Sequence, residues 1–311
     1  MQSHTKQASR DALIGALMVL AAAVTVSSKA IMVKLAYAYA EPFPVDASTL
    51  IALRMAFSAP FFIALAIWAR ASDAVPTISS QDAWAIALLG ILGGYGPMLL
   101  DFAGLVYVTA GLERIILYIY PTIVVLLSAA MFKHHIGKRV YFALLATYAG
   151  VALVVGHDVL TVKSGSAETI LGASLVAASA VAYAAYLIAS GRLIPRVGAS
   201  LFTAYTMLAA TVASAAHYAT TSHQVTILHL PTQVYLLSML MAVVATVLPA
   251  ILLNVGIHKI GSSKAALISS IGPVSTIFLA SIFLGEGITL LQLAGTCLVL
   301  IGVLVISLGK K

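Results

Sequence analysis

Long apolar stretches follow one another along the whole chain, and short polar segments separate them. A helix rises about 1.5 Å per residue, so about 20 apolar residues cross a hydrocarbon core of about 30 Å. Most stretches lack the alternation of polar and apolar residues that is typical of transmembrane barrel strands. Ten stretches have the required length, at residues 11–33, 48–69, 83–106, 112–132, 139–156, 169–190, 199–218, 232–257, 264–285 and 288–308. The pattern therefore predicts an all-α integral membrane protein with ten transmembrane helices.

The amino-acid composition agrees with a membrane protein and excludes several other classes. Of the 311 residues, 61% are apolar and 9% are charged, and the mean hydropathy is +1.06. Soluble domains are about half apolar and a quarter charged, so a water-soluble enzyme and a disordered chain are excluded. Cys297 is the single cysteine, which excludes an internal disulfide and a thiolate metal cluster. No phosphate-binding loop of the G-x-x-x-x-G-K-S/T type occurs, and we expect neither enzymatic activity nor a bound cofactor or metal.

The basic residues of the loops predict the orientation of the spans. If ten spans are counted, twelve loop lysines and arginines fall on the side of the N-terminus, and only Lys34 and Lys163 fall on the other. Because cytoplasmic loops carry the excess of basic residues, we expect both termini in the cytoplasm and the protein in the inner (plasma) membrane. Topology signals scattered over many loops thus account for the net charge of +7, and we expect no nucleic-acid partner.

The chain contains an internal repeat of five spans. When the sequence is shifted by 152 residues, prolines and glycines, which fix backbone geometry, coincide in the two halves. The matching pairs are Pro97 with Pro249, Gly104 with Gly256, Pro121 with Pro273, and Gly150 with Gly302. The two units are expected at residues 1–156 and 157–311. An odd number of spans reverses orientation, so the second unit is expected upside down relative to the first, as in many alternating-access transporters.

Motifs in both halves carry a resemblance to a known family. They are AGLERIILYIYP at residues 110–121, SSKAAL at 262–267 and FLGE at 283–286. The sequence resembles the drug/metabolite transporter superfamily and, within it, the EamA family of ten-span carriers. The resemblance implies export of amino acids or other small metabolites, and the similar YddG-like branch handles aromatic and other neutral amino acids. The first half departs from the pattern, since Lys133–His135 stands where the second half has Gly285–Gly287.

Matching interruptions in the third and eighth spans predict where a substrate binds. Proline removes a backbone donor and glycine loosens a turn, and the freed groups must be buried or face a water-filled cavity. Interrupted helices at corresponding places are the best sequence indication of a transporter site, and a packing kink is the alternative. The residues expected to shape or gate these helices are Gly94, Gly96, Pro97, Pro121, Pro249 and Pro273.

Polar and aromatic side chains near the interruptions are candidates for contact with a substrate. The amide of Asn254, for example, can both donate and accept hydrogen bonds. The expected substrate-binding residues are Tyr95, Met98, Phe102, Tyr118, Ser179, Tyr183, Asn254, Ser269 and Ser270. In the fourth span, Tyr118 and Tyr120 belong to different helical faces, and a single face can point inward. Ordinary packing is the alternative for the tyrosines, and a bond to a neighbouring helix is the alternative for the amide.

Five charged residues lie within or close to the predicted spans, namely Lys29, Arg54, Asp101, Glu113 and Arg114. Charges inside a membrane are costly and are usually paired or functional. Lys29, Arg54 and Arg114 are all candidate partners of Asp101, so a structural ion pair is the first expectation. A proton-binding site would instead need an unpaired, desolvated carboxylate. Lys29 is also a candidate for binding a carboxylate or phosphate.

Together these features predict a secondary-active or facilitative transporter that works by alternating access. The expected partners are the lipid bilayer and a small-molecule substrate, in the first place an exported neutral or aromatic amino acid. A sugar-phosphate, nucleotide-sugar or drug transporter of the same superfamily is the alternative, and three basic side chains would then face the cavity. A passive channel or a non-transporting membrane receptor is the alternative of another class. We expect a monomer, because the repeat is already fused within one chain.

Overall fold

All the regular secondary structure is helical in the residues that the structure of the protein, a computed structural model, describes. These are residues 2–42, 45–71, 78–132, 137–161, 166–221, 226–260, 265 and 268–307, and no strand occurs among them. The first half contains α1 (Gln2–Ala40), α2 (Ala47–Arg70), α3 (Ser80–Leu89), η1 (Gly90–Tyr95), α4 (Gly96–Gly104), α5 (Ala110–Leu117), α6 (Tyr120–Phe132) and α7 (Lys138–Thr161). The second contains α8 (Ser166–Val197), α9 (Ala199–Thr220), η2 (Ile227–His229), α10 (Thr232–Ala242), η3 (Val243–Val247), α11 (Leu248–Ile260), α13 (Gly272–Leu284) and α14 (Leu290–Ser307).

Eight of the predicted spans coincide with helices that are long and apolar enough to cross a membrane. Within the described residues the last two predicted spans correspond to shorter apolar helices, Gly272–Leu284 and Leu290–Val305. The first helix is longer than its predicted span, since its apolar part runs over Ala12–Ala40. The expectation of a helical membrane protein is thus confirmed, whereas the count of ten spans stays a prediction.

Local sequence signals explain several helix boundaries. The side chain of Asp46 accepts a hydrogen bond from the N–H of Thr49 at 2.7 Å and so caps α2. Thr109 caps α5 in the same way, through the N–H of Leu112 at 3.1 Å. These caps satisfy N–H groups that the first turn of a helix leaves free. At the end of α13, Gly285 has a φ of 67°, in the left-handed region that favours glycine.

The third and eighth predicted spans both contain a wide π-helical turn. In the third span η1 (Gly90–Tyr95) lies between α3 and α4, and in the eighth span η3 (Val243–Val247) lies between α10 and α11. The turns end at Tyr95 and Val247, which are 152 residues apart, the same separation as that of Pro97 and Pro249 just after them. The predicted interruptions therefore take the form of a widened turn within a continuing helix, a feature common at functional sites.

The fourth predicted span is divided in two. α5 ends at Leu117 and α6 begins at Tyr120, immediately before Pro121. In the ninth predicted span, α13 begins at Gly272, immediately before Pro273. Proline fits the first turn of a helix because its missing N–H would have no partner there. Each of these prolines thus lies at a helix start.

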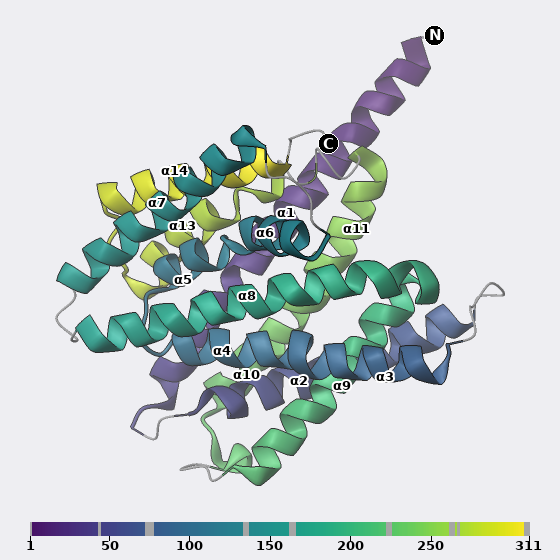
Figure 1. Cartoon of the computed structure of the whole chain (residues 1–311). Coiled ribbons are helices and arrows are strands. Elements are labelled where there is room, and N and C mark those ends of the chain that lie inside the picture. The colour runs from purple at the N-terminus through teal and green to yellow at the C-terminus, as the bar shows by residue number, and fades with distance from the viewer. Residues whose placement is uncertain are drawn as a thin grey trace.

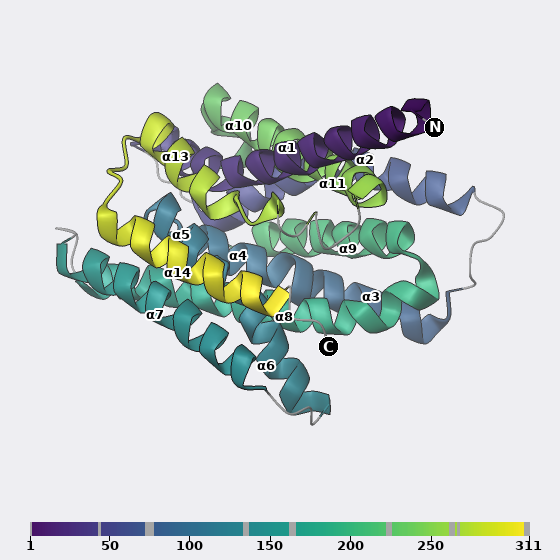
Figure 2. The same ribbon diagram turned by 90° about the horizontal axis from the view of Figure 1, so that it is seen from above.

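Helices from one half of the chain pack against helices from the other half. α1 contacts α10, α11 and α13, and we call these four helices the first helix group. α8 contacts α4, α5 and α6, and we call these four helices the second helix group. Two further pairs, α2 with α9 and α7 with α14, also join the halves (Figure 1). Seen from above, the first helix group occupies the upper part of the molecule and α8 the lower part (Figure 2).

Glycines allow close approach at corresponding positions of the two halves. A Cβ at Gly104 of α4 would lie 2.6 Å from Val176 Cγ2 and 3.0 Å from the carbonyl oxygen of Gly172 in α8. A Cβ at Gly256 of α11 would lie 2.4 Å from Val19 Cγ2, and 3.0 Å from the carbonyl oxygen of Gly15 in α1. α1 and α8 are therefore held against their partner helices by equivalent contacts, and both contacts need a residue without a side chain.

Candidate functional site

A cavity of about 510 Å³ lies between the two helix groups. Side chains from α1, α2, η1, α4, α5, α6, α8, α9, η3 and α11 line it, so both halves of the chain contribute. The two π turns contribute Gly93 and Gly94 on one side and Ala245 and Thr246 on the other. This volume suits a small molecule, and its position between packed helices is typical of ligand sites in helical proteins.

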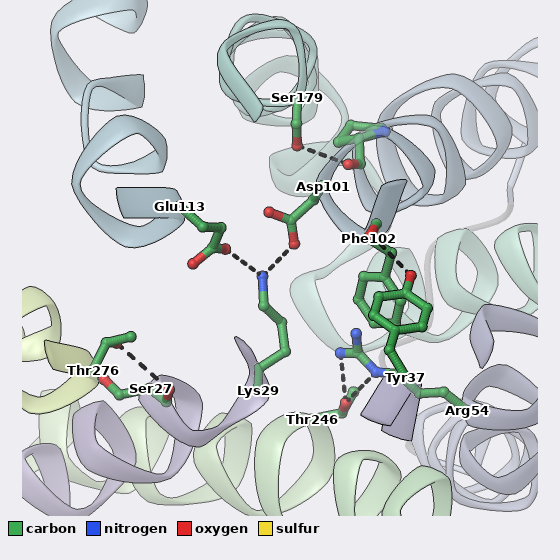
Figure 3. Close-up of polar contacts among 11 residues, drawn as sticks. Ser27, Lys29, Tyr37, Arg54, Asp101, Phe102, Glu113, Ser179, Thr246 and Thr276 are labelled. Atoms are coloured by element: carbon green, nitrogen blue, oxygen red, sulfur yellow. Dashed lines mark hydrogen bonds and ion pairs between the residues drawn. The ribbon is translucent and has the colours of Figure 1, made fainter. Parts of the chain in front are cut away.

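An ion cluster lies at this cavity and joins the two helix groups. Lys29 of α1 forms ion pairs with Asp101 of α4 and, at 3.1 Å, with Glu113 of α5. The lysine side chain is 14% exposed, and those of Asp101 and Glu113 are 5% and 0% exposed. Figure 3 shows the ammonium group between the two carboxylates. Because buried charges need partners, this arrangement fixes α1 against α4 and α5.

Arg54 of α2 reaches η3 from a second direction. Its Nη2 and Nε donate to the hydroxyl oxygen of Thr246 at 2.8 and 3.3 Å (Figure 3). The guanidinium also lies over the ring of Phe102, 5.6 Å from its centroid. This cation–π contact partly compensates for the burial of the charge. Arg54 therefore has neutral partners, and neither of them is a carboxylate.

Arg114 of α5 lines the cavity beside Tyr118. Its guanidinium carbon lies 5.6 Å from the centroid of the Tyr118 ring. The residue is 9% exposed, and among the described residues its Nε has no hydrogen-bond partner. A buried donor without a partner is costly, so this nitrogen is a point where a ligand would be bound favourably.

Four tyrosines form an aromatic wall of the cavity, namely Tyr118, Tyr120, Tyr183 and Tyr186. The rings of Tyr120 and Tyr183 meet edge to face at a centroid distance of 5.2 Å, and those of Tyr183 and Tyr186 stack at 6.0 Å. Tyr118 and Tyr120 both contribute because the break between α5 and α6 lies between them. The prediction that a single one of these two faces points inward assumed a continuous helix, and the break removes that assumption.

Backbone carbonyl groups near the widened turns and near the start of α13 accept hydrogen bonds from side chains. The Ser179 hydroxyl donates to the carbonyl oxygen of Pro97 at 2.7 Å, and the Tyr118 hydroxyl donates to that of Ser269 at 2.8 Å. The Thr246 hydroxyl donates to the carbonyl oxygen of Met241 at 3.0 Å. Such bonds keep irregular backbone stable at membrane depth, as the absence of water there requires.

Further polar contacts lie on the side of the ion cluster away from the N-terminus, and the one made by Glu286 joins the two halves. Lys34 Nζ donates to the carbonyl oxygens of Leu105 at 3.2 Å and Val108 at 2.8 Å. The carboxylate of Glu286 accepts hydrogen bonds from the N–H groups of Ala110 at 2.9 Å and Gly111 at 3.2 Å. By contrast, α1 contributes Ala22, Ala23, Val26 and Lys29 to the cavity. The cavity thus extends toward the N-terminal end of α1, and these contacts lie beyond its other end.

Most of the site residues expected from the sequence line the cavity. They are Lys29, Arg54, Gly94, Pro97, Met98, Asp101, Arg114, Tyr118, Ser179, Tyr183, Pro249 and Ser269. Gly93, Tyr120, Tyr186 and Thr246 also line it and were missed, although Tyr186 shares a helical stripe with Tyr183 and Gly93 adjoins Gly94. The sequence pattern could therefore have identified Tyr186 and Gly93 as cavity residues.

Other expected site residues lie elsewhere in the described structure. Tyr95 is buried in the apolar core and its hydroxyl contacts Nδ1 of His217. Phe102 is fully buried under Arg54. Gly96, Glu113, Pro121, Ser270 and Pro273 are likewise not among the residues that line the cavity, although Glu113 binds Lys29 at its edge. The side chain of Asn254 lies outside the described residues. We therefore assign Tyr95 and Phe102 to packing.

Comparison with known proteins shows the family of the chain. The profile of the EamA-like transporter family matches twice, over residues 13–156 and 170–308. The chain belongs to this EamA-like transporter family. The resemblance seen in the motifs is thereby confirmed at the level of the family. This EamA-like protein is a multi-pass membrane transporter of the drug/metabolite transporter superfamily.

Alignments with similar proteins cover nearly the whole EamA-like chain. The uncharacterized transporter YcbK of Bacillus subtilis (strain 168) is 33% identical over 302 residues, which cover 95% of this chain and 93% of that protein. The uncharacterized transporter sll1319 of Synechocystis sp. is 23% identical over 317 residues and covers 96% of this chain and 94% of its own. A solved protein structure aligns with a TM-score of 0.60 at 20% identity, covering 94% of this chain and 95% of its own, which shows a shared fold.

Proposed function

We propose that this EamA-like protein is a secondary-active or facilitative carrier whose cavity is exposed to one side of the membrane at a time. Its two five-span units, residues 1–156 and 157–311, would form an inverted repeat. Matching π turns, matching prolines and equivalent glycine contacts of α1 and α8 support this proposal. Inverted repeats allow two mirror-related states around one central site. Both termini would lie in the cytoplasm, with the protein monomeric in the inner membrane.

The observation that carries the proposal is the ion cluster at the cavity. Lys29 belongs to the first helix group, whereas Asp101 and Glu113 belong to the second. A relative movement of the two groups would change these ion pairs, and a bound substrate would favour one arrangement by the contacts it makes there. Charges inside a membrane are costly and are usually paired or functional, and their position between two helix groups supports a role in transport.

The proposed substrate is a small metabolite, in the first place a neutral or aromatic amino acid that is exported. The aromatic wall and the charged groups around the cavity suit a molecule with a ring and ionised groups. The basic side chains of Lys29, Arg54 and Arg114 at the cavity also favour an alternative, a sugar phosphate or nucleotide sugar. We propose transport without catalysis and without a bound cofactor.

Counterflow in proteoliposomes tests the proposal. Vesicles containing the purified protein are preloaded with one unlabelled amino acid, and the labelled amino acid is then added outside. A carrier with alternating access should accumulate the label transiently and saturably without any gradient. We expect this result for at least one aromatic amino acid.

The alternatives predict other results in the same assay. A channel would show neither saturation nor acceleration by the internal amino acid, and a receptor would bind its ligand without flux. If phosphorylated sugars exchange and amino acids do not, the substrate assignment falls while the carrier mechanism stands. Empty vesicles and vesicles with an unrelated carrier serve as controls.

A further inference from the structure

The charges at the cavity do not balance. Among the described residues the charged side chains there are Lys29, Arg54 and Arg114 on one hand and Asp101 and Glu113 on the other. With all groups ionised, three positive charges and two negative charges leave a net charge of +1. A buried charge without a counter-charge is costly, so an anionic ligand would be favoured here.

Arg114 is the cation best placed to receive this anion. Lys29 takes both carboxylates, and Arg54 donates to Thr246. Arg114 lines the cavity at 9% exposure, and it makes neither a salt bridge nor a hydrogen bond through Nε within the described part of the chain. An arginine fork matches the geometry of a carboxylate and binds it through parallel N–H bonds.

A positively charged group of a ligand would have to compete with Lys29 for the two carboxylates. One oxygen of Asp101 and one of Glu113 bind the ammonium of Lys29. The remaining oxygens, Oδ1 of Asp101 and Oε2 of Glu113, are buried without a hydrogen-bond partner in the described structure. Because Lys29 stands between them, a second ammonium group would have to displace it and would add to the excess of positive charge.

The aromatic wall lies directly beside Arg114, whose guanidinium faces the Tyr118 ring. We propose that the cavity recognises aromatic monocarboxylates, with the carboxylate bound at Arg114, the ring bound along the tyrosines, and an amino group not required. Neutral aromatic amino acids contain this carboxylate and remain ligands. The inference deepens the proposed function, because it takes the cavity as the substrate site.

Three probes with one ring and different charges test this inference. They are 3-phenylpropionate, which has the carboxylate alone, phenethylamine, which has the amine alone, and phenylalanine, which has both. Equilibrium dialysis with radiolabelled 3-phenylpropionate and the full chain in nanodiscs measures binding. We expect saturable binding that unlabelled phenylalanine displaces and phenethylamine does not.

Variants identify the residue that binds the carboxylate. Arg114→Gln should weaken binding of 3-phenylpropionate about tenfold or more, as the loss of a charge-assisted hydrogen bond does. Arg114→Lys keeps the charge without the fork and should fall in between. Arg70→Gln is the matched control, because Arg70 lies at the end of α2 and contacts Tyr205 away from the cavity. It should bind as the unmodified protein does, and nanodiscs without protein measure partition of the probe into lipid.

Displacement by phenethylamine, unchanged binding in Arg114→Gln, or the absence of saturable binding would each overturn the inference. Counterflow of phenylalanine that is unaffected by Arg114→Gln would also overturn it, while leaving the carrier function in place. Saturable binding that depends on Arg114, in a protein that shows no counterflow of any solute, would retain the inference and reject the carrier function.

Discussion

Lys29→Met is expected to abolish counterflow and to reduce the amount of folded protein strongly. The substitution leaves the carboxylates of Asp101 and Glu113 buried against each other without their shared counter-charge. Removing one partner of a buried ion pair costs about 3–5 kcal/mol. Methionine has a similar length and removes the charge with little change in packing. Thermal unfolding in detergent and counterflow in proteoliposomes measure the two effects separately.

A triple variant separates the stabilising role of the cluster from its role in transport. Lys29→Met combined with Asp101→Asn and Glu113→Gln leaves no buried carboxylate, and it should regain most of the lost thermal stability. Transport should stay low, because movement of the helix groups would no longer change any ion pair. Full recovery of counterflow would show that the cluster has a packing role alone. Unchanged stability of the single variant would contradict the ion pairing itself.

Gly93→Ala is expected to impair transport severely and to destabilise the protein. A Cβ at Gly93 would lie 2.5 Å from Cδ2 and 2.7 Å from Cβ of Tyr186. Tyr186 cannot yield easily, because its ring stacks between Tyr183 at 6.0 Å and Phe202 at 6.1 Å. Overpacking of this kind costs about 1–3 kcal/mol. The displaced ring would also disturb the aromatic wall, so counterflow should fall further than stability alone explains.

The neighbouring glycine provides a matched control. Gly94 also lines the cavity in the same π turn, but a Cβ there would lie 3.3 Å from Cβ of Ala210 and 3.9 Å from a backbone oxygen. Gly94→Ala should therefore lose less stability and less transport activity than Gly93→Ala. Equal losses in the two variants would mean that flexibility of the turn, rather than contact with Tyr186, decides the effect. Melting temperatures and initial counterflow rates of both variants make this comparison.

The positions of helices and of their irregularities could be predicted because they depend on local chemistry. Apolar length determines a span wherever the surrounding medium is lipid, and Pro97 and Pro249 alter the backbone regardless of their neighbours. The repeat at an offset of 152 residues therefore predicted where the π turns lie, at η1 and η3. The particular form of these irregularities, a widened turn, left no signal in the sequence, because η1 packs against α8 and α9 and η3 packs against α1 and α2.

The directions of individual side chains were harder to predict, because each irregularity shifts the helical phase. From η1 onward the inward face contains Gly94, Pro97, Met98 and Asp101, whereas the Tyr95 hydroxyl contacts His217. If a regular helical spacing is assumed across the π turn, the residues predicted to point inward lie on a neighbouring face of the helix. Tyr120 was missed for the same reason, since the break before it rotates α6.

The sequence did not decide which of three basic residues pairs with Asp101. Charge and position along a span do not determine the distance between two side chains. Helix packing decides the choice: α1 approaches α5, and Lys29 reaches both Asp101 and Glu113. Glu113 was not considered as a partner of Lys29, yet its side chain is fully buried beside it. The ion cluster thus results from the tertiary arrangement. The sequence predicted which charged residues lie in the membrane but not which of them form ion pairs.

The central claim, that one cavity opens to either side of the membrane in turn, can be tested by cysteine labelling. Because Cys297 is the sole cysteine, Cys297→Ser gives a clean background for Ser269→Cys in the cavity wall. A membrane-impermeant maleimide is applied from one side or the other, in vesicles of known orientation, with and without a transported substrate. We predict labelling from both sides, with substrate changing the two rates in opposite directions. Labelling from a single side under all conditions would contradict alternating access. Labelling rates from both sides that do not change when substrate is added would contradict it as well.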